Sequence, residues 1–395
     1  MKNKQNMEHI IWSTGHQLKH KTIVSSDNCF LYDSEGNQMI DLESGVWCTS
    51  VGHNNKRINN IITSQINKIT HTGFCYCNPQ IEEAAKKVLE ITGLKNGKCE
   101  FLSSGSEAVE YGMRAARSTT DKPLALIFAD SYFGAYGDAA IKSSESWYIY
   151  DRLKCSCSSN ENGCKGECED FNRIPFDKIG IFLLEPGSSS GLVRFPRQEL
   201  ITKIVSRIKD GNGIVMANEI TTGIGRTGKW FGYQHYSIQP DIVAMGKGIG
   251  NGYPVSVTAV SRQIADRLEK HKFHYSQSHQ NDPLGAVVAS EVIAIITEDE
   301  LVNTTFEKGS YLLDALLAMK KENPIINEVR GRGLMLAIEF TQNATFIYDQ
   351  LLKHGFIVAK RPNVEVLRLD PALTIEQKTI DKFLLALNQI LTEIK

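Results

Sequence analysis

The sequence predicts an α/β protein in which a large domain with a mostly parallel sheet precedes a smaller α+β domain. In the middle of the chain, short continuous apolar runs alternate with amphipathic stretches, which is typical of a parallel sheet covered on both faces. Towards the C-terminus the pattern changes to short strands flanked by helices. We therefore expect a large domain over residues 46–297, a small domain over 298–395, and a segment over 1–45 that contributes to the small domain.

The elements of the large domain follow from the spacing of apolar residues. A helix is expected over residues 107–117, because Ala108, Val109 and Met113 recur at the spacing of one helix face. Two more helices are expected over residues 198–209 and 286–296. Continuous apolar runs predict strands over residues 100–104, 124–129, 179–184, 213–217, 242–245 and 255–260.

The small domain is expected to contain shorter elements. Strands are predicted over residues 334–340, 357–359 and 364–369, with helices over 346–354 and 375–394. Thr374, followed three residues later by Gln377, predicts a capping box at the start of the last helix. A strand-like piece over residues 29–32 is expected to join this domain rather than the parallel sheet.

Composition excludes several classes of protein. The 395 residues include 44 Lys and Arg against 45 Asp and Glu, and the resulting net charge of −1 gives no electrostatic reason to expect a nucleic-acid partner. No apolar run approaches the roughly 20 residues of a membrane span, so no membrane partner is expected. The N-terminus does not resemble an export signal, and we therefore expect a cytoplasmic protein whose cysteines are thiols or metal ligands.

Chemically useful residues follow the predicted strands. Gly105 and Ser106 open a helix after one strand, where free backbone N–H groups and the helix dipole can bind an anion. Tyr132, Asn218 and Lys247 each come shortly after another strand. Because ligands of open parallel sheets bind at the carboxyl ends of the strands, these residues are expected to form one site, although each alone has a structural explanation such as a helix cap or a solvated lysine.

Several motifs together resemble the class III, ornithine- and acetylornithine-type, aminotransferases that depend on pyridoxal phosphate. The resemblance runs from about Asp41 to the end of the chain. It implies the aspartate-aminotransferase-like fold, known as fold type I. The motifs are SGSEAVE at 104–110, NEITTGIGRTG at 218–228, PDIV at 240–243, GKGIGNGYP at 246–254, RGRGLM at 330–335 and VLRLDPALT at 366–374.

The resemblance also implies the roles of individual residues. Lys247 corresponds to the catalytic lysine that binds the cofactor as a Schiff base and then moves a proton. Arg368 corresponds to the arginine that binds the substrate carboxylate, with a surface ion pair as the alternative. Ser278 stands where the family has a threonine that reaches the phosphate in the partner subunit, which implies a homodimer. Tyr132 corresponds to the aromatic residue that stacks on the pyridine ring, with a core aromatic as the alternative. The implied cofactor-binding residues are Gly105, Ser106, Tyr132, Asn218, Thr221, Lys247 and Ser278.

The chain departs from the family beside the pyridine ring. Asn218 replaces the usual aspartate, so it offers no charge to keep the ring nitrogen protonated, and Thr221 replaces a glutamine. The segment from Glu185 to Gly191 lacks the second glutamate of many members. These differences leave an aminomutase or an elimination lyase open as alternatives to an aminotransferase with an amino donor and a keto-acid or aldehyde acceptor. A non-enzymatic binding protein is disfavoured because Lys247 is present.

A cysteine-rich loop over residues 151–171 has no counterpart in those motifs. It contains four cysteines among Ser, Asn, Gly, Lys and Glu residues, a composition that gives a thiol little packing reason to be there. Four nearby thiolates can bind zinc or an iron–sulfur cluster, and free or redox-active thiols are the alternative. The expected metal ligands are Cys155, Cys157, Cys164 and Cys168.

Overall fold

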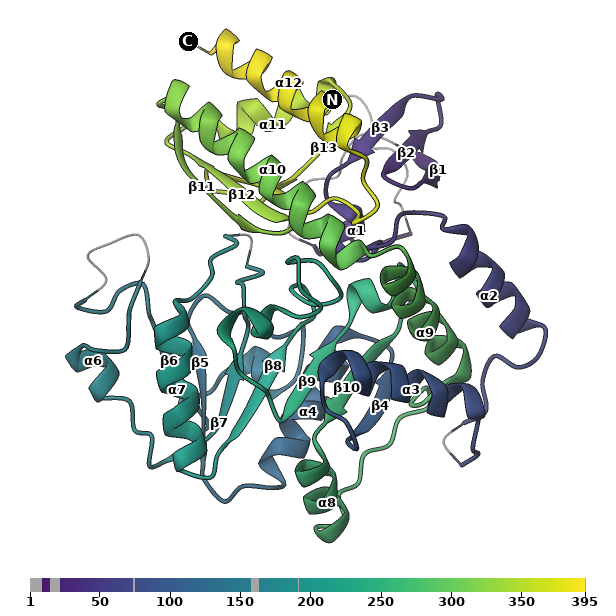
Figure 1. Cartoon of the computed structure of the whole chain (residues 1–395), viewed down its shortest axis with the longest axis vertical. Coiled ribbons are helices and arrows are strands. Elements are labelled where there is room, and N and C mark those ends of the chain that lie inside the picture. The colour runs from purple at the N-terminus through teal and green to yellow at the C-terminus, as the bar shows by residue number, and fades with distance from the viewer. Residues whose placement is uncertain (1–8, 15–21, 74, 158–162, 191, 395) are drawn as a thin grey trace.

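A seven-stranded sheet forms the centre of the protein's lower part in Figure 1. The computed structural model describes residues 9–14, 22–73, 75–157, 163–190 and 192–394. The strands from β9 to β6 pair in parallel, and β10 is antiparallel to both of its neighbours. Their order is β4 (Lys98–Leu102), β10 (Ser256–Val260), β9 (Ile242–Met245), β8 (Ile214–Asn218), β7 (Ile179–Leu184), β5 (Leu124–Phe128) and β6 (Trp147–Tyr150).

Helices cover both faces of this sheet, as the continuous apolar strands predict. Successive residues of a strand point to opposite faces. Ile181 and Leu183 accordingly pack in one cluster with α4 (Gly105–Arg117) and α8 (Arg262–Lys270). Phe182 and Leu184 pack in a second cluster with α7 (Gln198–Asp210). Every residue of β7 is therefore buried, and its sequence shows no polar alternation.

Three further helices pack beside the β4 end of the sheet. Helix α9 (Pro283–Glu298) contacts both α2 (Lys56–Ile66) and α3 (Pro79–Thr92). It is apolar on nearly all sides and largely buried, which agrees with its position between neighbours. Short helices at the rim are α1 (Ser44–Trp47), α5 (Asp138–Ile141) and α6 (Glu169–Asn172), and the two 3₁₀ helices are η1 (Gly232–Tyr236) and η2 (Lys247–Gly250).

The upper part in Figure 1 contains two four-stranded sheets. The N-terminal segment joins the C-terminal part directly, because Ile40 of β3 pairs in parallel with Phe356 of β13. Helices α10 (Leu301–Glu322), α11 (Ala344–Lys353) and α12 (Gln377–Glu393) accompany the sheets. The first sheet consists, in order, of β1 (Ile23–Asp27), β2 (Phe30–Asp33), β3 (Gln38–Asp41) and β13 (Phe356–Ile357). The second consists of β11 (Ile326–Arg332), β12 (Met335–Phe340), β15 (Val366–Leu369) and β14 (Ala359–Lys360).

The structure corrects several local predictions in this part. The predicted capping box is wrong, because α12 begins at Gln377 after Glu376, while the Thr374 hydroxyl donates to the Asn28 side chain. The single strand predicted over residues 357–359 is divided, and β13 and β14 belong to different sheets. The helices α2, α3 and α10 and the strands β6 and β11 were not predicted. Strand β6 has only four residues, too short for periodicity to distinguish.

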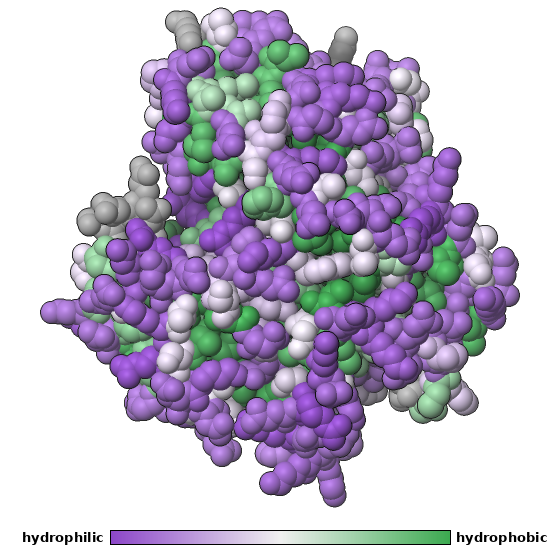
Figure 2. All heavy atoms as spheres, viewed as in Figure 1, coloured by the Kyte–Doolittle hydropathy of each residue, from purple (hydrophilic) through white to green (hydrophobic). Residues whose placement is uncertain are grey.

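The surface is mostly polar on the face shown in Figure 2, where hydrophobic residues gather in smaller patches between hydrophilic ones. Within the described residues, no helix combines the length and the apolar character needed to cross a membrane.

Candidate active site

The carboxyl ends of the central strands bring most of the predicted site residues to one edge of the sheet. Tyr132 follows β5, Glu185 follows β7, Asn218 ends β8 and Lys247 follows β9. These strands are neighbours in the sheet and run in parallel, so residues from distant parts of the chain meet there. This is the edge at which open α/β sheets bind ligands.

The N-terminus of α4 forms a close-packed cradle at this edge. Ser104 caps the helix, and the Ser104 N–H donates to Glu107 Oε2 at 2.8 Å in a capping box. A Cβ atom on Gly105 would lie 2.9 Å from Ile220 Cγ2, and one on Gly246 would lie 3.1 Å from Gly105 Cα. Only glycine permits this approach, which leaves the helix N-terminus accessible to an anion.

Ser106 and Tyr132 form the side of the cradle. The Ser106 hydroxyl accepts a hydrogen bond from the Ala135 N–H at 3.0 Å. A Cβ atom on Gly134 would lie 2.8 Å from Ser106 Oγ, so the chain after Tyr132 passes directly over the start of α4. The Tyr132 side chain is 51% exposed, which excludes its interpretation as a core aromatic.

The backbone of Tyr132 is held from both sides. Its N–H donates to Glu185 Oε2 at 3.1 Å, and its carbonyl accepts from Asn218 Nδ2 at 3.0 Å. The amide oxygen of Asn218 accepts from the Ile220 N–H at 3.3 Å, which gives the amide one orientation. Its second N–H hydrogen can therefore point to a ligand, whereas Asn218 has no negative charge to offer.

Two buried carboxyl groups stand beside Asn218, and sequence reasoning assigned a role to neither. Burial raises the pKa of Glu185 to about 7, although hydrogen bonds from Ser189 and from the Tyr132 N–H favour the charged form. Burial likewise raises the pKa of Glu219 to about 7. Glu219 accepts hydrogen bonds from Thr222 and from the Gly232 and Tyr233 N–H groups. These contacts commit Glu219 to the loop after β8, so it does not replace the missing aspartate.

Lys247 has a buried amine in an unusual backbone position. Its φ of 47° lies in the left-handed region, which costs energy for a residue with a side chain. Burial lowers the pKa of Lys247, and nearby Arg368 lowers it further. Within the described part of the chain, Lys247 forms no ion pair. Burial thus favours the neutral form of this amine more than solvent would, and the amine has no ion-pair partner to displace before it binds a ligand.

Trp47 joins Lys247 to Arg368, and sequence reasoning missed it. The Lys247 Nζ lies 4.5 Å from the centre of the indole rings, and the Arg368 guanidinium carbon lies 3.5 Å from it. The indole N–H donates to Asp370 Oδ1 at 2.7 Å, and Arg368 Nε donates to the other Asp370 oxygen. No side chain among the described residues hydrogen-bonds the two terminal nitrogens of Arg368, which leaves the guanidinium fork for a carboxylate.

Arg226, by contrast, is structural. It is fully buried and donates hydrogen bonds to the Leu334 and Pro371 carbonyls and, at 3.2 Å, to the Ser44 hydroxyl. Burial lowers its pKa to about 10. These bonds connect the loop after β8 to both the N-terminal and the C-terminal segments, close to Trp47.

Thr221 and Ser278, which were also predicted to bind the cofactor, form no hydrogen bond with the other predicted site residues within the described chain. Thr221 is buried, and its hydroxyl has no hydrogen-bond partner within the described chain, as expected of a group that awaits a ligand. Ser278 is exposed and lies beside His279, which lines a separate pocket with Ser103 and Asp282. Within the described part of the chain, no hydrogen bond joins Ser278 to the other predicted site residues, whereas the cradle, the Thr221 hydroxyl and the Lys247 amine fit pyridoxal phosphate.

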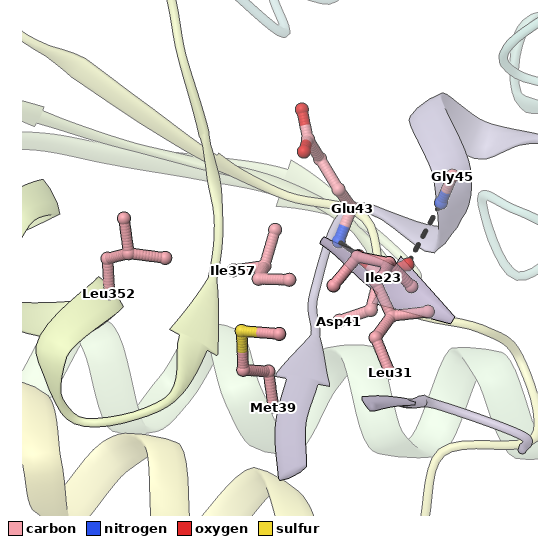
Figure 3. Close-up of a pocket in the computed structure, with 8 residues that line it drawn as sticks. All are labelled: Ile23, Leu31, Met39, Asp41, Glu43, Gly45, Leu352 and Ile357. Atoms are coloured by element: carbon pink, nitrogen blue, oxygen red, sulfur yellow. Dashed lines mark hydrogen bonds between the residues drawn. The ribbon is translucent and has the colours of Figure 1, made fainter. Parts of the chain in front are cut away.

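The largely apolar pocket of about 160 Å³ in Figure 3 contains none of the predicted site residues. One wall is formed by Asp41, whose carboxylate accepts from the Glu43 N–H at 2.8 Å and the Gly45 N–H at 3.0 Å. These bonds shape the turn that leads to Trp47. The pocket is therefore not part of the predicted site.

The four cysteines of the loop converge at a distance from this site, near α6 and β6. Their sulfur atoms all lie within 4.8 Å of one another. Three of the cysteines are buried against residues such as Tyr150 and Phe171, which corrects the prediction that thiols there lack a packing environment. Residues 158–162 of this loop lie outside the described residues. The cluster consists of Cys155, Cys157, Cys164 and Cys168.

Comparison with known proteins establishes the family. The family model Aminotransferase class-III matches residues 12–391, so the chain belongs to the class III aminotransferases. The chain is 30% identical to a leucine/methionine racemase of Thermococcus litoralis, over 94% of this chain and 90% of that protein. It is 28% identical to an ornithine aminotransferase of Halalkalibacterium halodurans, over 91% and 90% of the two chains. A crystal structure of an S-selective transaminase from Arthrobacter sp. superposes with a TM-score of 0.88 at 23% identity, covering 98% and 96%.

The family and its named members confirm the resemblance, the α/β fold and the enzyme class. The protein is a pyridoxal-phosphate-dependent aminotransferase that acts on small amino and keto substrates.

The buried Glu185 predicts a pH dependence of stability. An unfolded glutamate ionises near pH 4.3, whereas folded Glu185 keeps its proton up to about pH 7. Between these values the unfolded state binds fewer protons, so the free energy of unfolding should fall as pH rises. Glu185→Gln should flatten that fall by up to about 1.4 kcal/mol per pH unit.

Urea unfolding of both proteins from about pH 5 to about pH 7 measures this slope. Glu199→Gln, at an exposed position, controls for the loss of a carboxylate. Identical slopes for wild type and Glu185→Gln would show that Glu185 is ionised throughout this range.

Proposed function

We propose that this aminotransferase takes the amino group of a carboxylated donor, with Lys247 as the catalytic base and Arg368 as the carboxylate ligand. The observation that carries the proposal is the placement of both cations on Trp47 at the carboxyl edge of the sheet. The distance from the amine to the guanidinium is set through one rigid indole, which Asp370 holds by its N–H. A donor bound by its carboxylate to Arg368 would present its α-carbon toward Lys247.

The cradle at α4 would hold the cofactor phosphate. Gly105 and Ser106 supply backbone N–H groups at a helix N-terminus, and Thr221 supplies its unpartnered hydroxyl. Tyr132 would cover the ring with its exposed side chain. Bound pyridoxal phosphate supplies the electron sink and carries the amino group between the two half-reactions.

Lys247 would hold and move the proton of the donor's α-carbon. Burial lowers the pKa of Lys247, and the positive charge of Arg368 adds to the effect. A lowered pKa increases the fraction of neutral amine, which is the form that acts as a general base. The indole of Trp47 helps to exclude water from this amine, because it is itself buried.

Asn218 would donate a hydrogen bond to the ring nitrogen without charging it. One of its N–H hydrogens is already committed to the Tyr132 carbonyl. The other suits an unprotonated nitrogen acceptor, because an amide N–H is a donor only. We infer a weaker electron sink than an aspartate gives.

The active enzyme is proposed to be a cytoplasmic homodimer with its sites at the interface. Ser278 is exposed, and so are the side chains of Tyr76, Tyr132 and Tyr136. A partner subunit that covers this region would bring its Ser278 to the phosphate, consistent with its isolation in one chain. We retain the division into residues 1–45, 46–297 and 298–395 as part of this proposal.

The cysteine loop is proposed to bind a metal, either zinc or an iron–sulfur cluster. The convergence of the four sulfurs supports this proposal. The loop is separate from the transamination chemistry, which the residues at the sheet edge account for.

Borohydride reduction tests the role of Lys247. Reduction of the cofactor-loaded protein followed by peptide mass spectrometry should find the pyridoxyl label on Lys247, because its buried amine follows β9 at the same sheet edge as the start of α4. Lys142, whose Nζ donates to the Ser131 carbonyl, is the nearby control, and Lys142→Met should keep the label. A label on any other lysine would remove Lys247 from its role.

Arg368→Met tests the carboxylate site. The variant should lose roughly 2–5 kcal/mol of transition-state binding for carboxylated donors, as for loss of one partner of a buried charge pair. The loss of transition-state binding should be far smaller for amine donors that have no carboxylate. Arg330→Met removes another partly buried arginine, paired with Glu328 and Glu339, and controls for general damage. Equal losses for both kinds of donor would contradict the assignment.

Asn218→Asp tests the ring contact. A carboxylate in hydrogen-bond distance shifts a neighbouring pKa by roughly 1–3 units, so the bound cofactor's absorption should change and exchange of the donor's α-hydrogen should accelerate. Asn212→Asp, at an exposed site, is the control. Unchanged spectra and exchange would show that Asn218 does not contact the ring. The products distinguish the possible reactions. An aminotransferase converts the donor to a keto acid and passes its amino group to the acceptor. A lyase would instead release ammonia, and a racemase would racemise the donor without forming a keto acid.

A further inference from the structure

The four loop cysteines have the dimensions of a mononuclear site. Adjacent Sγ atoms are separated by 3.4 Å from Cys155 to Cys157, 3.5 Å from Cys157 to Cys164 and 3.7 Å from Cys164 to Cys168. Zinc–sulfur bonds of about 2.3 Å in a tetrahedron place the sulfurs about 3.8 Å apart. All of these separations exceed the roughly 2.05 Å of a disulfide bond, so no pair is joined covalently.

The same dimensions disfavour a polynuclear cluster. An iron–sulfur cluster inserts several iron and sulfide atoms between its cysteine ligands, so their sulfurs must spread further apart than around one ion. Here all four sulfurs lie within 4.8 Å of one another. A four-sulfur tetrahedron closed to further ligands is the form of a structural zinc site.

Two hydrogen-bond donors contact one of the sulfurs, Cys164 Sγ, as expected for a thiolate that carries negative charge. The Tyr150 hydroxyl donates to Cys164 Sγ at 3.1 Å, and the Gly166 N–H donates to the same sulfur at 3.1 Å. Such donors around the ligands orient them and stabilise their charge. Packing alone does not account for the cluster, because Cys157 is exposed and yet its sulfur turns toward the other three.

Arg152 connects the cluster to the cofactor edge. Its carbonyl accepts from the Cys164 N–H at 3.3 Å, a bond that zinc binding would leave in place. Its guanidinium pairs with Asp130 at 2.7 Å, and the two side chains are only 4% and 11% exposed. Asp130 precedes Tyr132 by two residues, so one buried residue contacts both the cysteine loop and the turn that carries the ring-stacking aromatic.

We propose that Cys155, Cys157, Cys164 and Cys168 bind one zinc ion in a tetrahedral site, and that this ion positions Tyr132 through the Arg152–Asp130 ion pair. The zinc site stands on the geometry of the cysteines alone, whereas its effect on Tyr132 rests on the proposed function of that residue in cofactor binding. Arg152 and Asp130 are positioning residues, because neither contacts the reacting atoms. The zinc takes no part in the transfer chemistry.

Metal analysis of the purified protein tests the site. One zinc per chain is expected, with no acid-labile sulfide, and Cys157→Ser should lose it. Cys75→Ser is the matched control, because Cys75 is also exposed and also belongs to a Cys-x-Cys pair. Protein grown with Co²⁺ in place of zinc should show the visible ligand-field bands of a tetrahedral thiolate site, at longer wavelengths than the cofactor absorbs.

The link to Tyr132 is tested by cofactor affinity, measured by titrating pyridoxal phosphate into each protein. Asp130→Asn should keep the zinc but weaken pyridoxal phosphate binding by roughly 2- to 30-fold, the range of a coupling contact. Cys157→Ser should weaken it by a similar factor. The two changes combined should weaken binding no more than either alone, because both break the same connection.

Several results would overturn the inference. Iron with labile sulfide, or no metal with four freely titrating thiols, would remove the zinc site. Additive effects of Asp130→Asn and Cys157→Ser would remove the connection to Tyr132. Failure of the proposed function would give a different result. In that case zinc would be present, but borohydride reduction would place the pyridoxyl label on a lysine other than Lys247.

Discussion

The indole of Trp47 is the contact on which the geometry of the active site depends. Its N–H is bound by buried Asp370, while its ring is contacted by the side chains of Lys247 and Arg368. Trp47 ends α1, Lys247 follows β9, Arg368 lies in β15 and Asp370 follows that strand. A cation over an aromatic ring is attracted by the ring's electrons, and the attraction is stronger when water is excluded. Trp47 thus sets the distance between the base and the carboxylate ligand.

Burying two cations together requires compensation, and the surroundings supply it unevenly. Asp370 pairs with Arg368 on one side, and the other side of the guanidinium can bind an anion. Lys247 has no such partner among the described residues, and burial lowers its pKa. The same environment therefore pairs one group with a carboxylate and shifts the other towards the neutral form that proton transfer requires.

The second constraint concerns the turn that carries Tyr132. Glu185 and Asn218 bind the two sides of its backbone, and Asp130 ties its beginning to Arg152. The replacement of aspartate by Asn218 is therefore more than a loss of charge, because the amide donates to the Tyr132 carbonyl and a carboxylate could not. The cysteine loop then supports the same turn from the outside, through a residue that no family motif includes.

The sequence by itself determined the parallel sheet and the positions that follow its strands, because continuous apolar runs leave little choice of burial and parallel strands end at one edge. It also predicted which four cysteines converge, since they are close along the chain. Only the tertiary structure decided that Trp47 and Asp370 belong to the site. Their partners are up to 323 residues away in sequence, as for Trp47 and Asp370, and no local pattern encodes such a contact. Likewise the division of one expected strand into β13 and β14 depends on which sheet each half pairs with, a choice made by packing.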